Sequence, residues 1–234
     1  MRHFGVLIPS TNTTCEIEFG RLVPPSLQVH VARLGKGGEG AFLPSNDPDI
    51  DYQSKLLGSA KVEVISLAQT SASLFSENYD EDVTHRMSAG AGVPAITSAQ
   101  AVGQALQALG VHRIAIVSPY SPSVIERARH YYETKYGMQV AALHSFDTSD
   151  AYTIGKLGPE NAFDAFVKIN RPEIEAFMIP GGNFPTMSYI AEWEREFTKP
   201  VITTNQAALW AMLRIMRVDE KLSGLGRLGE RVCC

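Results

Sequence analysis

Four clusters of small polar or glycine residues each follow a short apolar run in this chain. They cover residues 9–14, 69–73, 119–123 and 181–186. An apolar strand that opens into a helix through such a cluster is the repeating unit of a parallel α/β sheet. The N–H groups at the start of a helix are unpaired and partly positive, so they attract carboxylates and other oxyanions. Since the strand ends of a parallel sheet lie at one edge, we expect the clusters to form one anion site.

The rest of the chain continues the alternation of strands and helices. Apolar runs predict further strands over residues 29–34, 93–97, 140–145 and 201–204. Helices are predicted over residues 50–61, 99–109, 123–136, 186–197 and 205–217, and regular structure is not expected from residue 223 onward. This pattern predicts the α/β class, with two lobes that each hold a parallel sheet flanked by helices. We assign residues 1–95 and 205–234 to the first lobe and residues 96–204 to the second.

The composition argues against several classes of protein. Hydrophobic residues make up 44% of the 234 residues, charged residues make up 20%, and the net charge is −4. These values are typical of a folded chain without a membrane span or a nucleic-acid surface, so we expect a small-molecule partner. The apolar run near the N-terminus is too short for a signal peptide, which predicts a cytoplasmic protein. The three cysteines lack metal-ligand spacing, so we expect neither a disulfide framework nor a zinc site.

The segment GKGGEG at residues 35–40 is the most glycine-rich part of the chain. It lacks the glycine spacing and the following helix of a dinucleotide-binding fingerprint. We therefore interpret it as a flexible flap and expect no nucleotide cofactor.

Longer motifs at the four clusters resemble one known group of enzymes. They are GVLIPSTNTTCEIEF at residues 5–19, VISLAQTSASL at 64–74, VSPYSPSVIERARHYYE at 117–133 and MIPGGNFPT at 178–186. With these motifs the chain resembles the aspartate/glutamate racemase superfamily, and within it the branch of maleate cis-trans isomerases and arylmalonate decarboxylases. The resemblance extends over nearly the whole chain. It implies two lobes related by a pseudo-twofold axis, a site in the cleft between them, no metal or organic cofactor, and a homo-oligomer.

The resemblance also implies a site for a carboxylate. The matching hydrogen-bond donors are the side chains of Thr70, Ser71, Tyr120 and Asn12 and the backbone N–H groups of Gly181 and Gly182. Such donors would hold a carboxylate. They would also stabilise the enediolate-like charge that forms when a neighbouring carbon loses CO₂ or a proton.

Two cysteines usually flank the substrate in this group, and both are absent here. The matching positions are Gln69 and Gly181. A decarboxylase of the group itself has glycine at the first position, so the loss of one thiol is compatible with activity on a prochiral malonate. Without either thiol, the resemblance supplies no proton donor. We predict a cofactor-independent lyase or isomerase that acts on a small carboxylate or dicarboxylate with altered acid and base residues.

Two other functions stay open on the sequence alone. A hydrolase or hydratase would keep the same donors and activate a water molecule held by Gln69 and Asn183 in the space that the thiols vacated. A carboxylate-binding protein would use the donors without catalysis.

Each candidate residue also has a structural interpretation. Thr70, Ser71 and Asn12 are of types that cap helices. Tyr120 lies between prolines and would suit a packed loop, and Gly181 and Gly182 would suit a tight turn.

Candidates for a replacement acid or base are few. Cys15 lies in the first turn of a predicted helix, where a thiol can be reactive, although a buried structural cysteine is the commoner case. His85 and His144 have no carboxylate partner nearby in the sequence, which favours a structural role for each. The terminal Cys233 and Cys234 resemble a prenylation signal, but the chain has no GTPase motif to accompany it.

Overall fold

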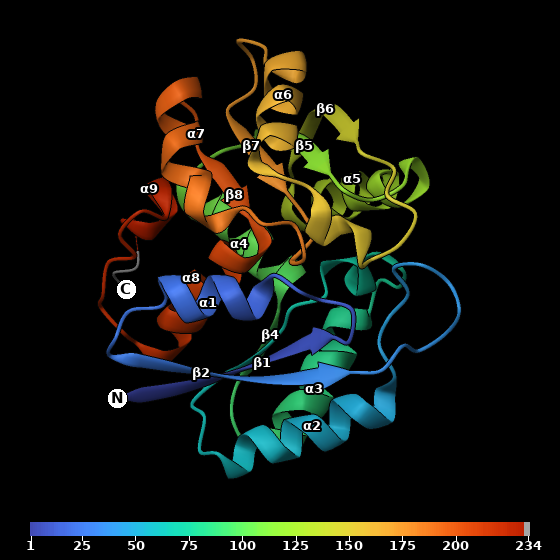
Figure 1. Ribbon diagram of the computed structural model, residues 1–234, viewed down its shortest axis with the longest axis vertical. Helices are drawn as coiled ribbons and strands as arrows, with labels where there is room; N and C mark the ends of the chain where they lie inside the picture. The colour runs from blue at the N-terminus through green and yellow to red at the C-terminus, as the bar shows by residue number, and fades with distance from the viewer. Residues whose placement is uncertain (232–234) are drawn as a thin grey trace.

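The computed structural model describes residues 1–231, which form two parallel sheets of four strands each (Figure 1). The first sheet has the strand order β2-β1-β3-β4 and the second has the order β6-β5-β7-β8, so one arrangement occurs twice. The strands are β1 (Arg2–Pro9), β2 (Leu27–Leu34), β3 (Ile65–Leu67), β4 (Ala95–Thr97), β5 (Arg113–Ser118), β6 (Gln139–Ser145), β7 (Ala176–Ile179) and β8 (Val201–Thr203). The predicted α/β class and the two lobes are confirmed. The assignment of each chain segment to a lobe stays a prediction.

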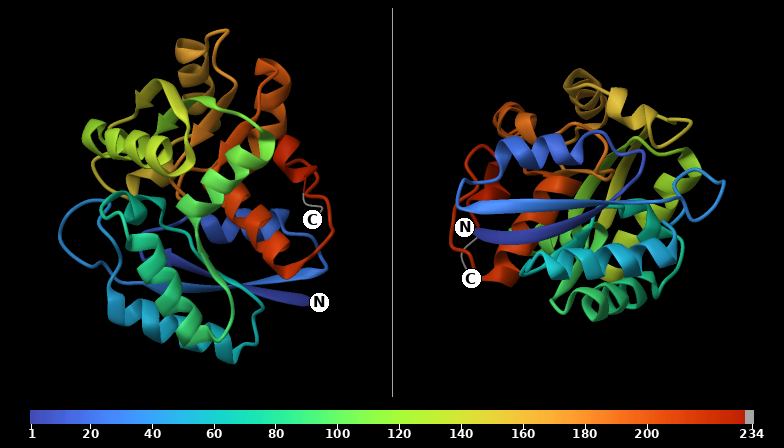
Figure 2. Two further views of the ribbon diagram at one scale, coloured as in Figure 1. Left: turned by 180° about the vertical axis from the view of Figure 1, so that it is seen from behind. Right: turned by 60° about the horizontal axis from the view of Figure 1, so that its bottom comes forward.

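Helices connect the strands and cover the sheets. The helices are α1 (Cys15–Leu22), α2 (Asp47–Ser59), α3 (Tyr79–Ala91), α4 (Ser98–Leu109), α5 (Pro122–Tyr136), α6 (Pro159–Ile169), α7 (Ile190–Phe197), α8 (Thr204–Met216) and α9 (Gly226–Gly229). Three short 3₁₀ helices are η1 (Thr70–Leu74), η2 (Thr153–Lys156) and η3 (Met187–Tyr189). In the middle of the molecule, α4 and α8 pack side by side between the two sheets (Figure 2).

The central strand β1 is buried on both faces, as its uninterrupted apolar sequence predicts. Phe4, Val6 and Ile8 point into the large core that both lobes share. Leu7 points the other way, into a second core beneath α2 and α3 that includes Ile50. This alternation follows from the two-residue period of a strand. Burial of each such side chain contributes about 1.5–3 kcal/mol to folding, so β1 holds both layers of its lobe together.

The two sheets repeat a local sequence motif where their last strands end. Residues 96–100 read ITSAQ and residues 202–206 read ITTNQ. In each copy the glutamine side chain accepts a hydrogen bond from the threonine N–H at the start of the helix, at 3.0 Å for Gln100 and Thr97 and 3.0 Å for Gln206 and Thr203. This capping interaction starts α4 and α8 in the same way. The repeat supports the pseudo-twofold relation of the lobes.

Two local expectations were wrong. After β3 the chain forms only the short 3₁₀ helix η1, and the long helix α3 begins at Tyr79, where three acidic residues favour a helix start. The C-terminal segment from residue 223 contains α9 and is packed, because Leu225 and Leu228 are fully buried and Trp210 Nε1 donates a hydrogen bond to Arg231 O at 3.0 Å. Leucines three residues apart on one helical face explain this packing.

No helix within residues 1–231 has both the length and the apolar character needed to span a bilayer.

Candidate functional site

A cavity lies where the central strands of both sheets end. These strands are β1 and β3 in the first sheet and β5 and β7 in the second. Ligands of parallel sheets bind outside the carboxyl ends of the strands, at the point where the strand order reverses. The cavity encloses about 90 Å³, several times the space that one water molecule needs. Its lining includes every residue that the sequence placed in the site: Asn12, Gln69, Thr70, Ser71, Tyr120, Gly181, Gly182 and Asn183.

Tyr120 and Ser71 form one polar end of the cavity. Tyr120 follows β5 of the second sheet, and Ser71 lies in η1 after β3 of the first. Both side chains are buried, and burial raises the pKa of Tyr120, while the hydroxyls of Ser71 and Thr70 and the Ser71 N–H act against this rise. The phenol therefore stays protonated at neutral pH. A protonated phenol beside a serine hydroxyl can donate hydrogen bonds to an oxyanion.

The Thr70 hydroxyl belongs to a buried chain of hydroxyl groups behind the cavity. It lies 3.0 Å from Ser98 Oγ of α4 and 3.2 Å from Thr204 Oγ1 of α8. Ser98 and Thr204 lie outside the four polar clusters that the sequence marks as the site. Both follow the last strand of their sheet in the repeated ITSAQ and ITTNQ segments, and this repeat is the signal that identifies them.

The turn after β7 supplies backbone N–H groups, but they are not the two that the sequence suggested. The Gly181 N–H donates to Thr204 Oγ1 at 2.9 Å, so it is not available to a ligand. The N–H groups of Gly182 and Asn183 have no hydrogen-bond partner within residues 1–231, and both residues line the cavity. The available backbone donors are therefore those of Gly182 and Asn183, one residue further along the chain than the predicted pair Gly181 and Gly182.

Gly181 is the residue that permits this turn. Its φ is +113°, a backbone conformation that other residues rarely adopt. A Cβ at this position would also lie 2.9 Å from Pro119 Cγ. The turn thus needs glycine on both conformational and steric grounds.

Two asparagines in the lining use their side-chain oxygens to stabilise the fold. Asn12 Oδ1 accepts hydrogen bonds from the N–H groups of Thr14 and Cys15, at 3.0 Å and 2.9 Å, so it caps α1. Its Nδ2 has no partner within the described chain. Asn183 Oδ1 accepts from Thr13 N at 2.7 Å and from Thr13 Oγ1 at 3.3 Å. Asn183 therefore joins the turn after β7 to the loop after β1.

Gln69 anchors the glycine-rich flap, defined here as residues 35–45, which runs between β2 and α2 (Figure 1). Its Oε1 accepts hydrogen bonds from Ser45 N at 3.0 Å and Ser45 Oγ at 2.7 Å, and its Nε2 donates to Leu43 O at 2.8 Å. On the flap, Phe42 packs against Tyr120 with 5.1 Å between the ring centroids. The flap therefore forms one wall of the cavity, and Gln69 holds that wall in place.

Replacing Gln69 by alanine should release the flap while the protein stays folded. Three hydrogen bonds are lost, at about 0.5–1.5 kcal/mol each, so we expect a stability loss of about 1.5–4.5 kcal/mol. Hydrogen exchange of the amides of residues 36–43 and of Ser45 should become at least about tenfold faster. Gln100→Ala is the matched control, because it removes a capping glutamine away from the cavity. Unchanged exchange across the flap would contradict the anchoring role.

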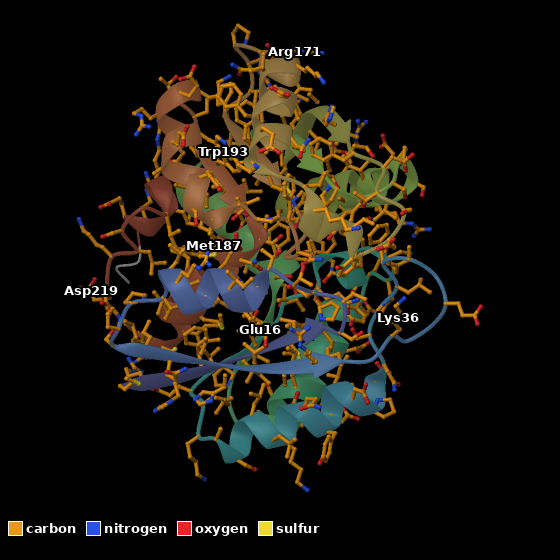
Figure 3. All side chains as sticks on the ribbon, viewed as in Figure 1. Glu16, Lys36, Arg171, Met187, Trp193 and Asp219 are labelled. Carbon is orange, nitrogen blue, oxygen red and sulfur yellow. The ribbon has the colours of Figure 1, made fainter. Side chains whose placement is uncertain are left out.

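Few ionisable groups line the cavity. Lys36 on the flap is exposed (Figure 3). Asp150, the other charged residue of the lining, is also exposed. Backbone N–H groups, that of Thr153 first, lower the pKa of Asp150, so this carboxylate is an ionised cap for the following turn. Cys15 is fully buried in α1 outside the lining, and burial raises the pKa of its thiol far above the ordinary value. No cysteine or histidine within residues 1–231 lines the cavity.

Metal ligands do not cluster in the part of the chain that the structure describes. No group of three or more His, Cys, Asp or Glu side chains in residues 1–231 is arranged to hold a metal ion. The terminal Cys233 and Cys234 lie outside the described residues.

A family model described as arylmalonate decarboxylase matches residues 48–229, which is most of the chain. The chain belongs to this family. It is 24% identical to the maleate isomerase of Alcaligenes faecalis over 96% of this chain and 94% of the relative. It is 26% identical to the arylmalonate decarboxylase of Bordetella bronchiseptica over 96% of this chain and 95% of the relative. The resemblance inferred from the sequence motifs is thereby confirmed.

Solved structures agree with this membership of the arylmalonate decarboxylase family. The crystal structure of a variant of the maleate isomerase Iso from Pseudomonas putida S16 with maleate has a TM-score of 0.90 to this chain at 25% identity. The similarity covers 97% of both chains. The equivalence of Gln69 and Gly181 to the cysteines of relatives stays a prediction, but within residues 1–231 no thiol lines the cavity.

Proposed function

We propose that this protein is a cofactor-independent lyase that removes CO₂ from a small malonate-type dicarboxylate. The observation that carries the proposal is a set of four hydrogen-bond donors around one cavity, of which the two backbone N–H groups have no partner in the described chain. They are the hydroxyls of Tyr120 and Ser71 and the backbone N–H groups of Gly182 and Asn183. Four donors of this kind can hold one carboxylate and stabilise added negative charge on it.

The proposed reaction begins with one substrate carboxylate on these donors. The bond from the central carbon to the second carboxylate breaks, CO₂ leaves, and the electron pair of that bond moves into the held carboxylate to form an enediolate. Each preorganised donor stabilises such a charge by about 3 kcal/mol. The apolar side chains of Leu34, Phe42 and Ile154 also line the cavity, and they favour neutral CO₂ over a charged carboxylate. The carbon then takes a proton from the phenol of Tyr120, the one buried titratable side chain in the described lining, and the phenolate regains a proton from solvent water.

The lining favours this lyase over an isomerase. A cis-trans isomerisation must convert the C=C double bond to a single bond, which requires a nucleophile to add to one carbon. Among the described residues, neither cysteine nor histidine lines the cavity, and the one carboxylate of the lining, Asp150, caps the turn that follows it. Decarboxylation needs only the oxyanion donors and a proton. The similarity to the Bordetella bronchiseptica arylmalonate decarboxylase supports the same choice.

The hydrolase alternative lacks support in the cavity. It requires an acceptor that takes a proton from water, and the amides of Gln69 and Asn183 were its candidates. The oxygen of each amide already accepts two hydrogen bonds, which fills its two lone pairs.

Turnover of a substrate panel in isotopic water tests the proposal. We expect phenylmalonate or an alkylmalonate to lose CO₂ and, in D₂O, to gain deuterium at the α carbon, while maleate stays unchanged. The product should contain no oxygen from H₂¹⁸O. Incorporation of ¹⁸O into a product of a cyclic amide would indicate a hydrolase instead. Binding without turnover of any panel member would indicate a carboxylate-binding protein.

A further inference from the structure

Glu18 is a buried carboxylate that the proposed reaction does not use. It lies on α1, is 6% exposed, and does not line the cavity. Its Oε1 accepts hydrogen bonds from Thr186 N at 2.6 Å and Met187 N at 2.8 Å. These two N–H groups begin η3 on the second lobe, and Met187 lies beside α1 (Figure 3). No lysine or arginine of the described chain forms an ion pair with Glu18.

The other oxygen of Glu18 leads toward the cavity. Glu18 Oε2 accepts a hydrogen bond from Asn205 Nδ2 at 2.7 Å. The same Nδ2 donates to the carbonyl oxygen of Gly182 at 3.0 Å. Asn205 belongs to the first turn of α8 and is 1% exposed. One buried amide thus connects a carboxylate outside the site to the backbone of the turn that lines it.

Holding the Gly182 carbonyl fixes the direction of the next N–H group. A trans peptide is planar, so its C=O and N–H point in opposite directions. The hydrogen bond from Asn205 to Gly182 O therefore directs the Asn183 N–H away from Asn205. In the preceding peptide, Gly181 O accepts from Phe184 N at 3.0 Å, which fixes the Gly182 N–H in the same way.

Burial raises the pKa of Glu18, and the three N–H groups that donate to it act against this rise by favouring the carboxylate. The carboxylate form selects the orientation of the Asn205 amide. With Nδ2 between Glu18 and Gly182, the amide donates to two oxygens, and its own Oδ1 is left buried without a partner in the described chain. The flipped amide would place Oδ1 against the carboxylate and the carbonyl oxygen, which is electrostatically unfavourable. The buried Asn205 Oδ1 without a partner destabilises the fold by the free energy of a lost hydrogen bond with water. The Glu18 carboxylate raises the free energy of the flipped orientation above that of the observed one.

We propose that Glu18 and Asn205 are positioning residues that aim the Asn183 N–H group into the cavity, next to the Gly182 N–H group that the hydrogen bond from Phe184 fixes. Neither side chain touches the ligand. The inference rests on the proposed function, because it assigns these two N–H groups to the carboxylate. It predicts that oxyanion binding depends on a charge on α1 of the first lobe, across the interface from the turn.

Titration of ¹⁵N-labelled protein with succinate tests the inference. Succinate is a dicarboxylate that can undergo neither decarboxylation of the malonate type nor cis-trans isomerisation. In the wild-type protein we expect the amide resonances of Gly182 and Asn183 to shift saturably. In Glu18→Gln and in Asn205→Ala, the succinate concentration at half-saturation should rise at least tenfold. On any malonate that the wild-type protein decarboxylates, kcat should fall at least tenfold in both variants.

Glu194→Gln is the matched control. Glu194 is also a buried glutamate that accepts hydrogen bonds from backbone N–H groups, at 3.0 Å from Val201 and 2.7 Å from Arg227, and it does not line the cavity. Its variant should titrate like the wild-type protein at a comparable loss of melting temperature. If Glu18→Gln does not fold, Asn205→Ala carries the comparison alone.

Two outcomes overturn the inference. In one, succinate leaves the Gly182 and Asn183 amides of the wild-type protein unshifted. In the other, the folded Asn205→Ala or Glu18→Gln variant reaches half-saturation within twofold of the Glu194→Gln control. A wild-type protein that binds succinate through these amides but decarboxylates no malonate refutes the proposed function and leaves the positioning role supported.

Discussion

Replacing Tyr120 by phenylalanine should lower kcat by about 10²- to 10³-fold, the effect of removing one oxyanion donor. The ring and its contact with Phe42 are retained, so the protein should lose no more than about 1 kcal/mol of stability. The cavity keeps its Ser71 hydroxyl and its backbone donors, so KM should change much less than kcat. Steady-state kinetics on the malonate turned over by the wild-type protein, with thermal unfolding in parallel, measures both quantities.

Tyr132→Phe provides the control for Tyr120→Phe. Tyr132 is also fully buried, and its hydroxyl has no hydrogen-bond partner in the described chain, but it does not line the cavity. Its variant should keep full activity. Since burial raises the pKa of Tyr120 above its ordinary value of 10.0, wild-type activity should show no alkaline loss from this phenol below pH 10. A Tyr120→Phe enzyme within threefold of the wild-type kcat would remove Tyr120 from the proposed site.

The positions of the strands could be predicted because the physics that decides them is local. Central strands buried on both faces need unbroken apolar runs, and residues 3–10 and 113–118 show them. The small polar residues after each run mark the strand ends, so the cavity could be placed at those clusters before the fold was known. The 3₁₀ helix η1 could not be predicted in this way, because a hydroxyl-rich segment suits the start of either helix type.

The roles of individual side chains depend on partners that are far apart in the sequence. The Gly181 N–H donates a hydrogen bond to Thr204 Oγ1, 23 residues later in the chain. Gln69 Oε1 accepts a hydrogen bond from Ser45 N, 24 residues earlier. The acidic residue Glu18 suits a helix start, yet its partner Asn205 is 187 residues away. Sequence patterns show which residue types meet at the cavity. They do not show which of their hydrogen-bonding groups the fold has already used.

This distinction changes the chemistry expected of the site. The sequence suggests Gln69 and Asn183 as amides that hold a water molecule. In the fold, the Gln69 oxygen instead holds the flap at Ser45, and the Asn183 oxygen holds the loop after β1 at Thr13. The backbone N–H groups of Gly182 and Asn183 have no partner in the described chain, so they are left for the ligand. The cavity therefore offers hydrogen-bond donors, including the Tyr120 phenol. Such donors act by electrostatic stabilisation of an oxyanion.

Cys15 should react with iodoacetamide at least about 10³-fold more slowly in the folded protein than in denaturant, because full burial ties its exposure to unfolding. Burial, followed by the charges of Glu18 and Glu16, raises the pKa of the thiol, so the reactive thiolate is rare at neutral pH. Because the pKa of Cys15 is raised, the rate of labelling of the folded protein should increase only at a higher pH than for an ordinary cysteine. Labelling is measured by mass spectrometry in a Cys233→Ser/Cys234→Ser background, where Cys15 is the only thiol.

The same background tests whether the chemistry depends on any thiol. We expect unchanged turnover after prolonged exposure to iodoacetamide, and unchanged kcat when Cys15→Ser is added to leave a chain without cysteine. The serine variant should unfold at a somewhat lower temperature, because a hydroxyl replaces a thiol in the core around Phe4 and Phe19. If activity instead falls in proportion to Cys15 labelling, and a bound dicarboxylate protects against both, the thiol takes part in the reaction. The electrostatic mechanism would then be wrong, because α1 would have to move to bring Cys15 into a cavity that it does not line.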